Sequence, residues 1–291
     1  MSTTLEAETQ PITDADALRQ GDIFEWMTTH QDPPWRRWGL VVTADCDIVQ
    51  RKHGNVLSYV PLIRTSDYTR LFMLPPLLEK ALSVRHQQMM SAVHALQARY
   101  RPEFPDPLSA EAIETLLYGD GPDIVLDTLE VPPGEQRDRA YQALADVADA
   151  VHAQRDGNMN AVFNAIVRLR GGTPQNKDAL RTQIEDKFAR LPGDAFFIGR
   201  IQGADDSGFV AYLRLVRELS IPAIALKTPD LQRDGVSARR LSRLAAPFLY
   251  RLTQQLGDVF SSIGLPQAYE NARREHVSSM WSAATNTFGT I

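Results

Sequence analysis

The sequence predicts an α+β fold in which a small, strongly curved β-sheet or half-barrel carries a large helical insertion and is followed by C-terminal helices. Strand-like apolar runs occupy the first 70 residues and return after residue 193. Between them, apolar residues recur at three- and four-residue steps, which is typical of helices that bury one face. The 291 residues are 43% hydrophobic and 23% charged, so the chain can bury the core of one large or two small domains.

The first β region is predicted at residues 21–70, after a polar and acidic stretch at 1–20 that we expect to be a flexible arm. The fold starts near Gly21, and Ile23, Phe24, Trp26 and Met27 indicate a short strand. Gly39 to Thr43 is a continuous apolar run suited to a strand buried on both faces, and Leu57 to Ile63 is a third strand. Three short strands in about 45 residues indicate a sheet that curves strongly.

The helical insertion is predicted at residues 71–192, where the apolar period changes. Leu74, Leu77, Leu78 and Ala81 begin a pattern of three- and four-residue steps. Prolines between residues 102 and 107 and glycines between residues 157 and 172 divide the insertion into several helices.

Strand signals return at residues 193–230, in Ala195 to Ile201 and in Gly208 to Val216, with a turn at Gly203 to Ser207. This is the pattern of a hairpin. The simplest architecture joins the hairpin to residues 21–70 in one β platform. The alternative is two separate domains that meet near residue 193.

Residues 231–284 are predicted to form C-terminal helices, and residues 285–291 a frayed tail. Leu241 to Ile263 fits one long amphipathic helix, with Pro247 as a candidate kink. Its apolar face can cover the core or pair two copies of the chain, so a homo-oligomer stays open.

Charge and cysteine content restrict the function classes. A net charge of −5 excludes a wholly cationic surface, so a nucleic acid would have to bind a local basic patch. A single cysteine excludes an internal disulfide, and the N-terminus lacks the basic and apolar regions of a signal peptide. No apolar run approaches the roughly 18–20 residues that cross a bilayer. We therefore expect a cytoplasmic protein that does not insert into a membrane.

Two carboxylates flank the only cysteine, in Asp45-Cys46-Asp47, directly after the buried strand. At positions i and i+2 of an extended segment, they can point to the same side and bind Mg²⁺, which prefers oxygen ligands. A nuclease could use that pair, helped by Arg51 or Lys52. The alternative, which we favour, is turn chemistry, with Asp47 ending the strand and Asp45 paired with an arginine. No cofactor is then expected, and Mg²⁺ belongs only to the nuclease alternative.

Cys46 is a candidate nucleophile, because a thiolate is the reactive form of cysteine. No histidine forms a motif with it, and neighbouring carboxylates raise a thiol pKa. We expect Cys46 to be a small buried hydrophobic residue.

One candidate binding surface combines basic and aromatic side chains in Trp35-Arg36-Arg37-Trp38. A flat cationic and aromatic loop can stack on bases or bind a carboxylate. The alternative, which we favour, is that Trp38 begins the buried strand and Trp35 packs on that strand.

A second candidate surface is an arginine cluster near the predicted C-terminal helix. Its members are Arg233, Arg239, Arg240, Arg243 and Arg251. The pattern is that of a phosphate-contacting helix face. We favour the alternative, an amphipathic surface helix whose arginines pair with the acidic excess of the chain.

Gly21-Asp22-Ile23, followed by a loop and the apolar strand Leu40-Val41-Val42, resembles the opening of the PemK/MazF toxin family. The resemblance covers residues 21–63 and implies a small SH3-like barrel. Members of that family are ribosome-independent RNases, so it also implies a nuclease. The Cys-Asp-Ile segment at residues 46–48, with Phe260 to Pro266, is similar to uncharacterised bacterial proteins found near phage-defence genes.

Two functional hypotheses follow. The first, which we favour because no complete catalytic set is visible, is a non-catalytic binding or regulatory module that recognises a protein or nucleic acid partner, within a bacterial anti-phage defence system. Trp35 to Trp38 would lie at the rim of its curved sheet. The second is a metal-dependent or PemK/MazF-like nuclease that uses Asp45 and Asp47.

Overall fold

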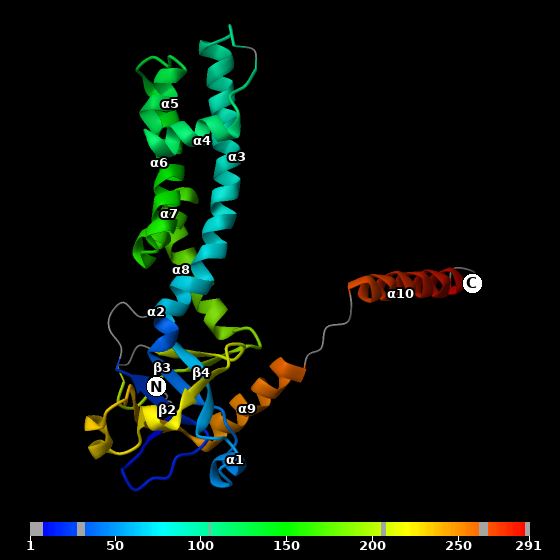
Figure 1. Ribbon diagram of the computed structural model, residues 1–291. Helices are drawn as coiled ribbons and strands as arrows, with labels where there is room; N and C mark the ends of the chain where they lie inside the picture. Colours follow the sequence, from blue (N-terminus) through cyan, green and yellow to red (C-terminus); the bar gives the residue numbers. More distant parts are fainter. Residues whose placement is uncertain (1–7, 28–32, 105, 205–207, 262–266, 289–291) are drawn as a thin grey trace.

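Both predicted β regions contribute to one sheet, which the computed structural model shows as a curled half-barrel at the base of a long helical arm (Figure 1). The structure describes residues 8–27, 33–104, 106–204, 208–261 and 267–288, with side chains as far as residue 281. Within these residues the strand order is β1-β9-β2-β3-β4-β6-β5, while β7 pairs with β4 and β8 with β9. The strands are β1 (Thr9–Pro11), β2 (Asp22–Trp26), β3 (Trp38–Val41), β4 (Val56–Arg64), β5 (Ala195–Ile198), β6 (Phe209–Tyr212), β7 (Arg217–Ser220), β8 (Ile224–Ala225) and β9 (Ala238–Leu244). The predicted α+β class is confirmed, and the two-domain alternative is wrong because β4 pairs with β6.

The sheet curls because β4 is shared between two partners along one edge. The first half of β4 pairs with β7 and its second half with β6, while β3 lies along the other edge. At the ends of the strand order, Thr9 Oγ1 donates to the carbonyl of Arg200 at 3.1 Å and accepts from the N–H of Gln202 at 2.9 Å. The Glu8 carboxylate accepts from the N–H of Gly199. The two ends of the sheet therefore meet through side chains instead of a β ladder, which leaves a half-barrel.

The concave and convex faces of the sheet each bury an apolar cluster. Ile23 and Leu40 belong to the inner cluster, which α9 (Ala246–Ser261) covers, and the adjacent residues Phe24 and Val41 belong to the outer one. This division follows the alternation of side chains along a strand. The sheet is thus buried on both faces where its central strands run.

Gly39 on β3 is required by the packing of the outer cluster. The rings of Trp26 and Tyr59 stack across it with centroids 4.9 Å apart. A Cβ at this position would lie 2.6 Å from the Tyr59 ring and 2.7 Å from the Trp26 ring. Only glycine allows the two rings to meet over the strand.

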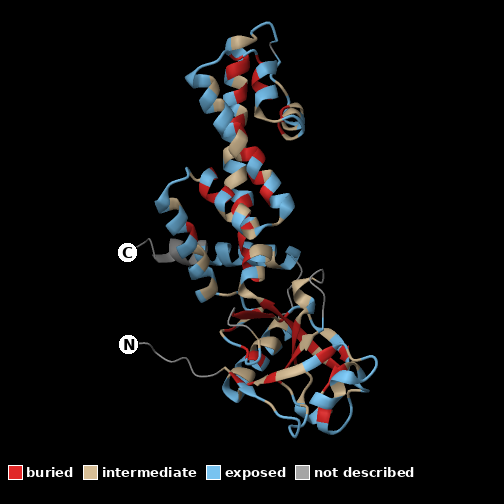
Figure 2. Cartoon of the chain, turned by 90° about the vertical axis from the view of Figure 1, so that its left-hand side faces the viewer, coloured by how far each residue is buried: buried red, intermediate tan, exposed pale blue. Residues whose placement is uncertain are grey.

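The helical insertion forms an arm with its own core (Figure 1). Its helices are α2 (Thr65–Tyr68), the π-helix η2 (Thr69–Met73), α3 (Leu74–Tyr100), α4 (Ala110–Gly119), α5 (Pro122–Thr128), α6 (Glu135–Asp156), α7 (Met159–Leu169) and α8 (Pro174–Ala189). Figure 2 shows buried residues along the facing sides of these helices and exposed residues outside. At the base, Tyr68 and Met73 pack with Ile63 and Val210 of the sheet, so the arm is joined to the half-barrel by a shared apolar cluster.

Two predicted boundaries are wrong. Thr9 to Pro11, inside the predicted flexible arm, forms β1 and pairs with β9. Residues 238–244, predicted as C-terminal helix, form β9, and the helix begins only at Ala246. The strand buries Ala238, Ser242 and Leu244, whereas the arginines between them were interpreted as one face of a helix. Pro247 lies in the first turn of α9, where proline is tolerated, and does not kink it.

The remaining elements are α1 (Asp45–Val49), α10 (Gln267–Phe288) and the 3₁₀ turns η1 (Pro34–Arg36), η3 (Ile221–Ala223) and η4 (Thr228–Gln232). α10 extends past residue 285, the predicted start of the tail. Residues 1–7 of the predicted arm, 205–207 of the predicted turn, 262–266 of the segment similar to bacterial proteins and 289–291 of the tail lie outside the described residues.

Candidate functional sites

The predicted acidic pair lies in the first turn of helix α1 and not in an extended segment. β3 ends at Val41, and α1 begins at Asp45. Residues i and i+2 of a helix do not face each other, so the expected side-by-side geometry of Asp45 and Asp47 is wrong. Asp45 Oδ1 accepts a hydrogen bond from the backbone N–H of Gln20 at 2.7 Å, which holds the start of α1 against the N-terminal segment. Both acids lie where the helix dipole favours negative charge.

Cys46 is exposed, so the prediction of a small buried hydrophobic residue is wrong. α1 has only five residues and buries only Ile48, which leaves no inward position for the cysteine. Its Sγ lies 3.8 Å from Asp47 Oδ1. Across the described residues, no group of three or more His, Cys, Asp or Glu side chains could hold a metal ion.

The cationic and aromatic segment is divided between core and surface. Trp38 is buried in β3, with its ring in edge contact with Phe209 at 5.2 Å between centroids. The guanidinium of Arg37 lies 4.4 Å from the centroid of the Trp38 ring, in a cation–π contact. Trp35 is half-buried against the cluster at the base of the arm, and Arg36 is exposed. The packing alternative is therefore confirmed for Trp38, and Trp35 packs at the arm's base.

Three residues of the arginine cluster lie on strand β9, so their prediction as part of a helix is wrong. Arg239 is 48% exposed and binds Glu25 of β2, with Nη2 to Oε2 at 2.6 Å and Nε to Oε2 at 2.9 Å. Arg240 and Arg243 are 2% and 11% exposed and bind Asp22, also on β2. Their guanidinium groups face a carboxylate of the chain itself.

Asp22 is the centre of this buried cluster. Its carboxylate accepts from Arg243 Nε at 2.5 Å, from Arg240 Nη1 at 3.2 Å and from the N–H of Arg19 at 3.1 Å. Burial raises the pKa of Asp22. The hydrogen bond from Arg243 is the largest effect in the opposite direction, followed by the positive charge of Arg243, the backbone hydrogen bond from Arg19 and the positive charge of Arg240. A buried carboxylate is expected only where such partners surround it.

The same two arginines fasten the N-terminal segment to the sheet. Arg240 Nη2 donates to the carbonyls of Thr13 at 3.2 Å and Asp16 at 2.7 Å, and Arg243 Nη2 donates to the carbonyl of Ala17 at 2.7 Å. Asp16 lies beside them, and its pKa is lowered chiefly by hydrogen bonds from Thr13, with smaller effects of Arg243 and Arg240. The predicted arm is ordered here because it supplies acceptors to guanidinium groups that the sheet buries.

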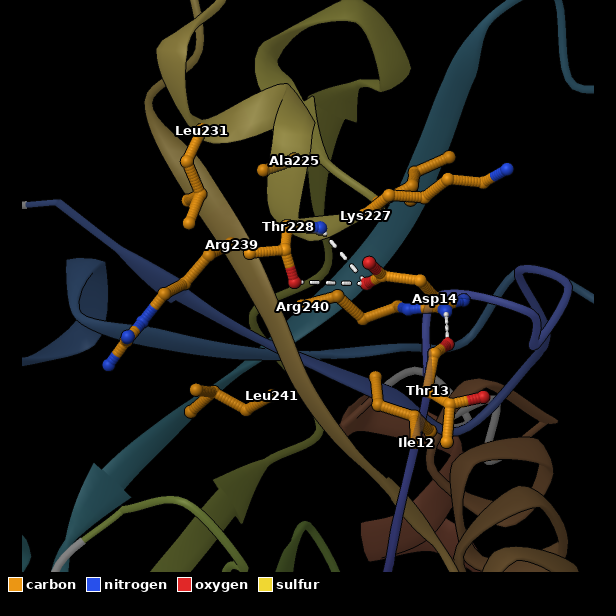
Figure 3. A pocket seen from close by; sticks show the side chains of 11 residues that line it. Ile12, Thr13, Asp14, Ala225, Lys227, Thr228, Leu231, Arg239, Arg240 and Leu241 are labelled. Atoms are coloured by element: carbon orange, nitrogen blue, oxygen red, sulfur yellow. Dashed lines mark hydrogen bonds between the residues drawn. The ribbon is translucent and has the colours of Figure 1, made fainter.

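A pocket of about 310 Å³ lies between this N-terminal segment, β9 and the turn that begins η4 (Figure 3). We call it the β9 pocket. Asp14 Oδ1 accepts from the N–H of Thr228 at 2.9 Å and from its hydroxyl at 3.1 Å, which joins two walls of the pocket. Figure 3 shows the side chain of Arg240 crossing the pocket toward Thr13 and Asp14. Apolar residues make up much of the rest; they are Ile12, Ala225, Leu226, Leu231 and Leu241.

Helix α10 forms a surface of a different kind. Figure 1 shows it apart from the half-barrel and the arm. Its side chains from residue 267 to 281 are all exposed except that of Glu270, which is half-buried. The large apolar residues among them, each more than half exposed, are Tyr269, Val277, Met280 and Trp281. At 100° per residue these four fall within one third of the helix circumference.

Sequence reasoning missed Asp22 as a site residue, although a signal was present. Asp22 stands at the start of a strand whose next two residues are buried, and an acid in such a place needs cationic partners. Arg240 and Arg243 were visible, but their assignment to a helix concealed the pairing of β2 with β9, in which Asp22 lies opposite Arg243.

No family model, curated protein or solved structure matches this chain. None of the described helices is long and apolar enough to span a membrane.

Proposed function

We propose that this chain is a binding module that recognises a protein partner through helix α10. The observation that carries the proposal is the exposed apolar face of Tyr269, Val277, Met280 and Trp281 on a helix of 22 residues. Most of the stability of a helix in a protein comes from packing of its apolar face. An amphipathic helix that offers this face to solvent is the form in which helices dock into a groove of a partner.

Charge favours a protein partner over a nucleic acid. The described part of α10 carries Glu270, Arg273, Arg274 and Glu275, which sum to zero, and the whole chain has a net charge of −5. A polyanion is recognised by a surplus of positive charge. Arg240 and Arg243, two of the five predicted phosphate contacts, bind Asp22 instead. As part of the proposal, the partner belongs to the bacterial defence setting that the sequence resemblance implies.

The test places two charges on the apolar face of α10 and compares them with the same charges elsewhere on the helix. Val277→Glu with Met280→Glu changes the apolar face; Asn271→Glu with Ser279→Glu is the matched control outside it. The full chain, crosslinked in the cells that encode it, should give crosslinks from α10 to one partner by mass spectrometry. We expect those crosslinks to disappear in the first variant and to persist in the control.

Two results would contradict the proposal. Equal crosslinking in both variants would show that the apolar face of α10 is not the contact. A dimer of this chain in light scattering, lost only in the Val277→Glu, Met280→Glu variant, would identify the partner as a second copy and not as another protein.

A further inference from the structure

We propose that Tyr59, Arg217 and Arg36 form a site on the outer face of the half-barrel that binds a phosphorylated side chain of another protein. The three residues come from β4, β7 and the turn η1 that precedes β3. None of them lies on α10, so the inference is independent of the proposed function. The group recognised is a phosphate monoester, which has a charge of about −1.5 to −2 and three terminal oxygens.

The sheet places Arg217 beside Tyr59. The two residues lie directly opposite each other in the ladder between β7 and β4. Side chains at opposite positions of an antiparallel pair project from the same face, with Cβ atoms about 4.5–5.5 Å apart. The next pair on that face, Leu57 and Leu219, belongs with Tyr59 to the outer cluster. Glu218 projects from the other face, so it does not separate the two side chains.

The hydroxyl of Tyr59 needs an acceptor. Its ring is held against Trp26 with centroids 4.9 Å apart, and the residue is only 6% exposed. The hydroxyl forms no hydrogen bond with a residue that the structure describes, yet it is not among the polar atoms that the chain encloses without a partner. It is therefore open to a ligand. The hydroxyl of a buried tyrosine is usually hydrogen-bonded, so this one points to a partner from outside the chain.

Two guanidinium groups act on the same hydroxyl. Burial raises the pKa of Tyr59, and the positive charges of Arg217 and Arg36 lower it. The turn η1, which carries Arg36, packs against β4. Neither arginine has an ion pair or a side-chain hydrogen bond within the described parts of the chain. The Nε of Arg217 is enclosed, so its terminal nitrogens are the atoms that a ligand can reach.

The number and placement of these groups select the ligand. Two positive charges and one O–H donor converge on one point, which matches the charge and the three terminal oxygens of a phosphate monoester. A nucleic acid backbone has a single charge on each phosphodiester and is bound by a row of cations. Because Arg36 is exposed, the site is open to solvent. Small molecules are bound in sites that enclose them, whereas a phosphorylated side chain is presented by its own chain to an arginine cluster.

The experiment titrates the full chain by calorimetry with a capped glycine peptide that has one central phosphoserine. The comparison ligands are the same peptide with serine, the same peptide with glutamate, and oligothymidylate without a terminal phosphate. We expect the phosphoserine peptide to bind and the other three to bind at least about tenfold more weakly, because each lacks a dianion.

Variants of the three residues test the site directly. Arg217→Met should raise the Kd for the phosphoserine peptide at least about tenfold, and Tyr59→Phe, which keeps the ring, at least about fivefold. Arg36→Met should raise it at least about threefold, as expected for an exposed ion pair. Because Arg36 lies outside the sheet, this variant tests the site even if a substitution on β4 or β7 unfolds the half-barrel.

The matched controls lie on other elements. Arg181→Met removes an exposed arginine from α8, and Tyr250→Phe removes the hydroxyl of an exposed tyrosine on α9; both should leave the Kd unchanged. Thermal unfolding of each variant establishes that the half-barrel is intact. Absence of phosphoserine peptide binding, or an unchanged Kd in folded Arg36→Met or Tyr59→Phe, would overturn the proposal. Oligothymidylate binding as tight as that of the peptide would also overturn it and would identify a nucleic acid site.

Discussion

The buried cluster around Asp22 gives the sharpest stability prediction, through the substitution Arg243→Met. Methionine keeps most of the length of the arginine stem and removes its charge and donors. The change leaves the Asp22 carboxylate, which is fully buried, with Arg240 as its remaining guanidinium partner. It also removes the donor to the carbonyl of Ala17. Both effects destabilise the folded half-barrel.

The expected loss is about 3–5 kcal/mol at pH 7, the cost of removing one partner from a buried ion pair. Solvent screening reduces it little, because Arg243 is 11% exposed. A domain has only about 5–15 kcal/mol of total stability, so the effect will be large. The matched control is Arg239→Met on the same strand, whose ion pair is half exposed and should contribute at most about 1 kcal/mol.

The pH dependence of this loss has a definite sign. Burial raises the pKa of Asp22, and removing the hydrogen bond from Arg243 will raise it further. Between the ordinary value of 3.8 and the raised pKa, the folded variant holds a proton that the unfolded chain has released. Stability of Arg243→Met should therefore fall as pH rises through that interval. The deficit relative to the wild type should shrink on acidification.

Tryptophan fluorescence in urea measures this prediction. Three of the four tryptophans, Trp26, Trp35 and Trp38, lie in the half-barrel, and none lies in the helical arm. The fourth, Trp281 on α10, is already 71% exposed in the folded chain. The change in fluorescence on unfolding therefore reports mainly the half-barrel, while circular dichroism reports mainly the arm. A loss below about 1 kcal/mol at pH 7, or a deficit that grows as pH falls, would refute the reasoning.

Three further predictions concern other positions. Asp16→Asn should lower the urea midpoint at pH 7 but leave it unchanged at a pH below the folded pKa of Asp16. The pKa of Asp16 is lowered from 3.8 on folding, so its carboxylate stabilises the fold above pH 3.8, and this stability is lost as pH falls through the folded pKa. Gly39→Ala should cost at least about 1–3 kcal/mol by overpacking against the Tyr59 ring, whereas Gly257→Ala, with nothing within 4 Å, should cost nothing in the same assay. Cys46 should react with a thiol reagent at the rate of an exposed cysteine without denaturant, and slow labelling that urea accelerates would contradict its position.

The strands that sequence reasoning located correctly are those that bury both faces. Ile23 and Phe24 are both fully buried, as are Leu40 and Val41, so each strand appears as a continuous apolar run. The same signal identified the hairpin at Phe209 and Val210. A single sheet interrupted by the insertion was the simplest prediction, but two separate domains stayed open until the pairing of β4 with β6 excluded them.

β9 could not be located in this way, because three of its seven residues are arginines. Burying Arg240 depends on the carboxylate of Asp22, which is 218 residues away in sequence. The local sequence around β9 carries no information about an ion pair with a residue so distant in the chain. α1 was missed for a different reason: it has only five residues, too few for a helical period to show.

The buried cluster and the β9 pocket are consequences of one arrangement. The N-terminal segment, residues 8–20, has few apolar residues. It is held to the sheet by the pairing of β1 with β9 and by acceptors offered to Arg240 and Arg243. By lying there it places Ile12 and Asp14 as a wall of the pocket. The orientation of Arg240 that leaves its Nε without an acceptor is fixed by its bonds to Asp22 and to the carbonyls of this segment. Because the N-terminal segment forms a wall of the pocket, anything that fills the pocket should stabilise the segment in its place.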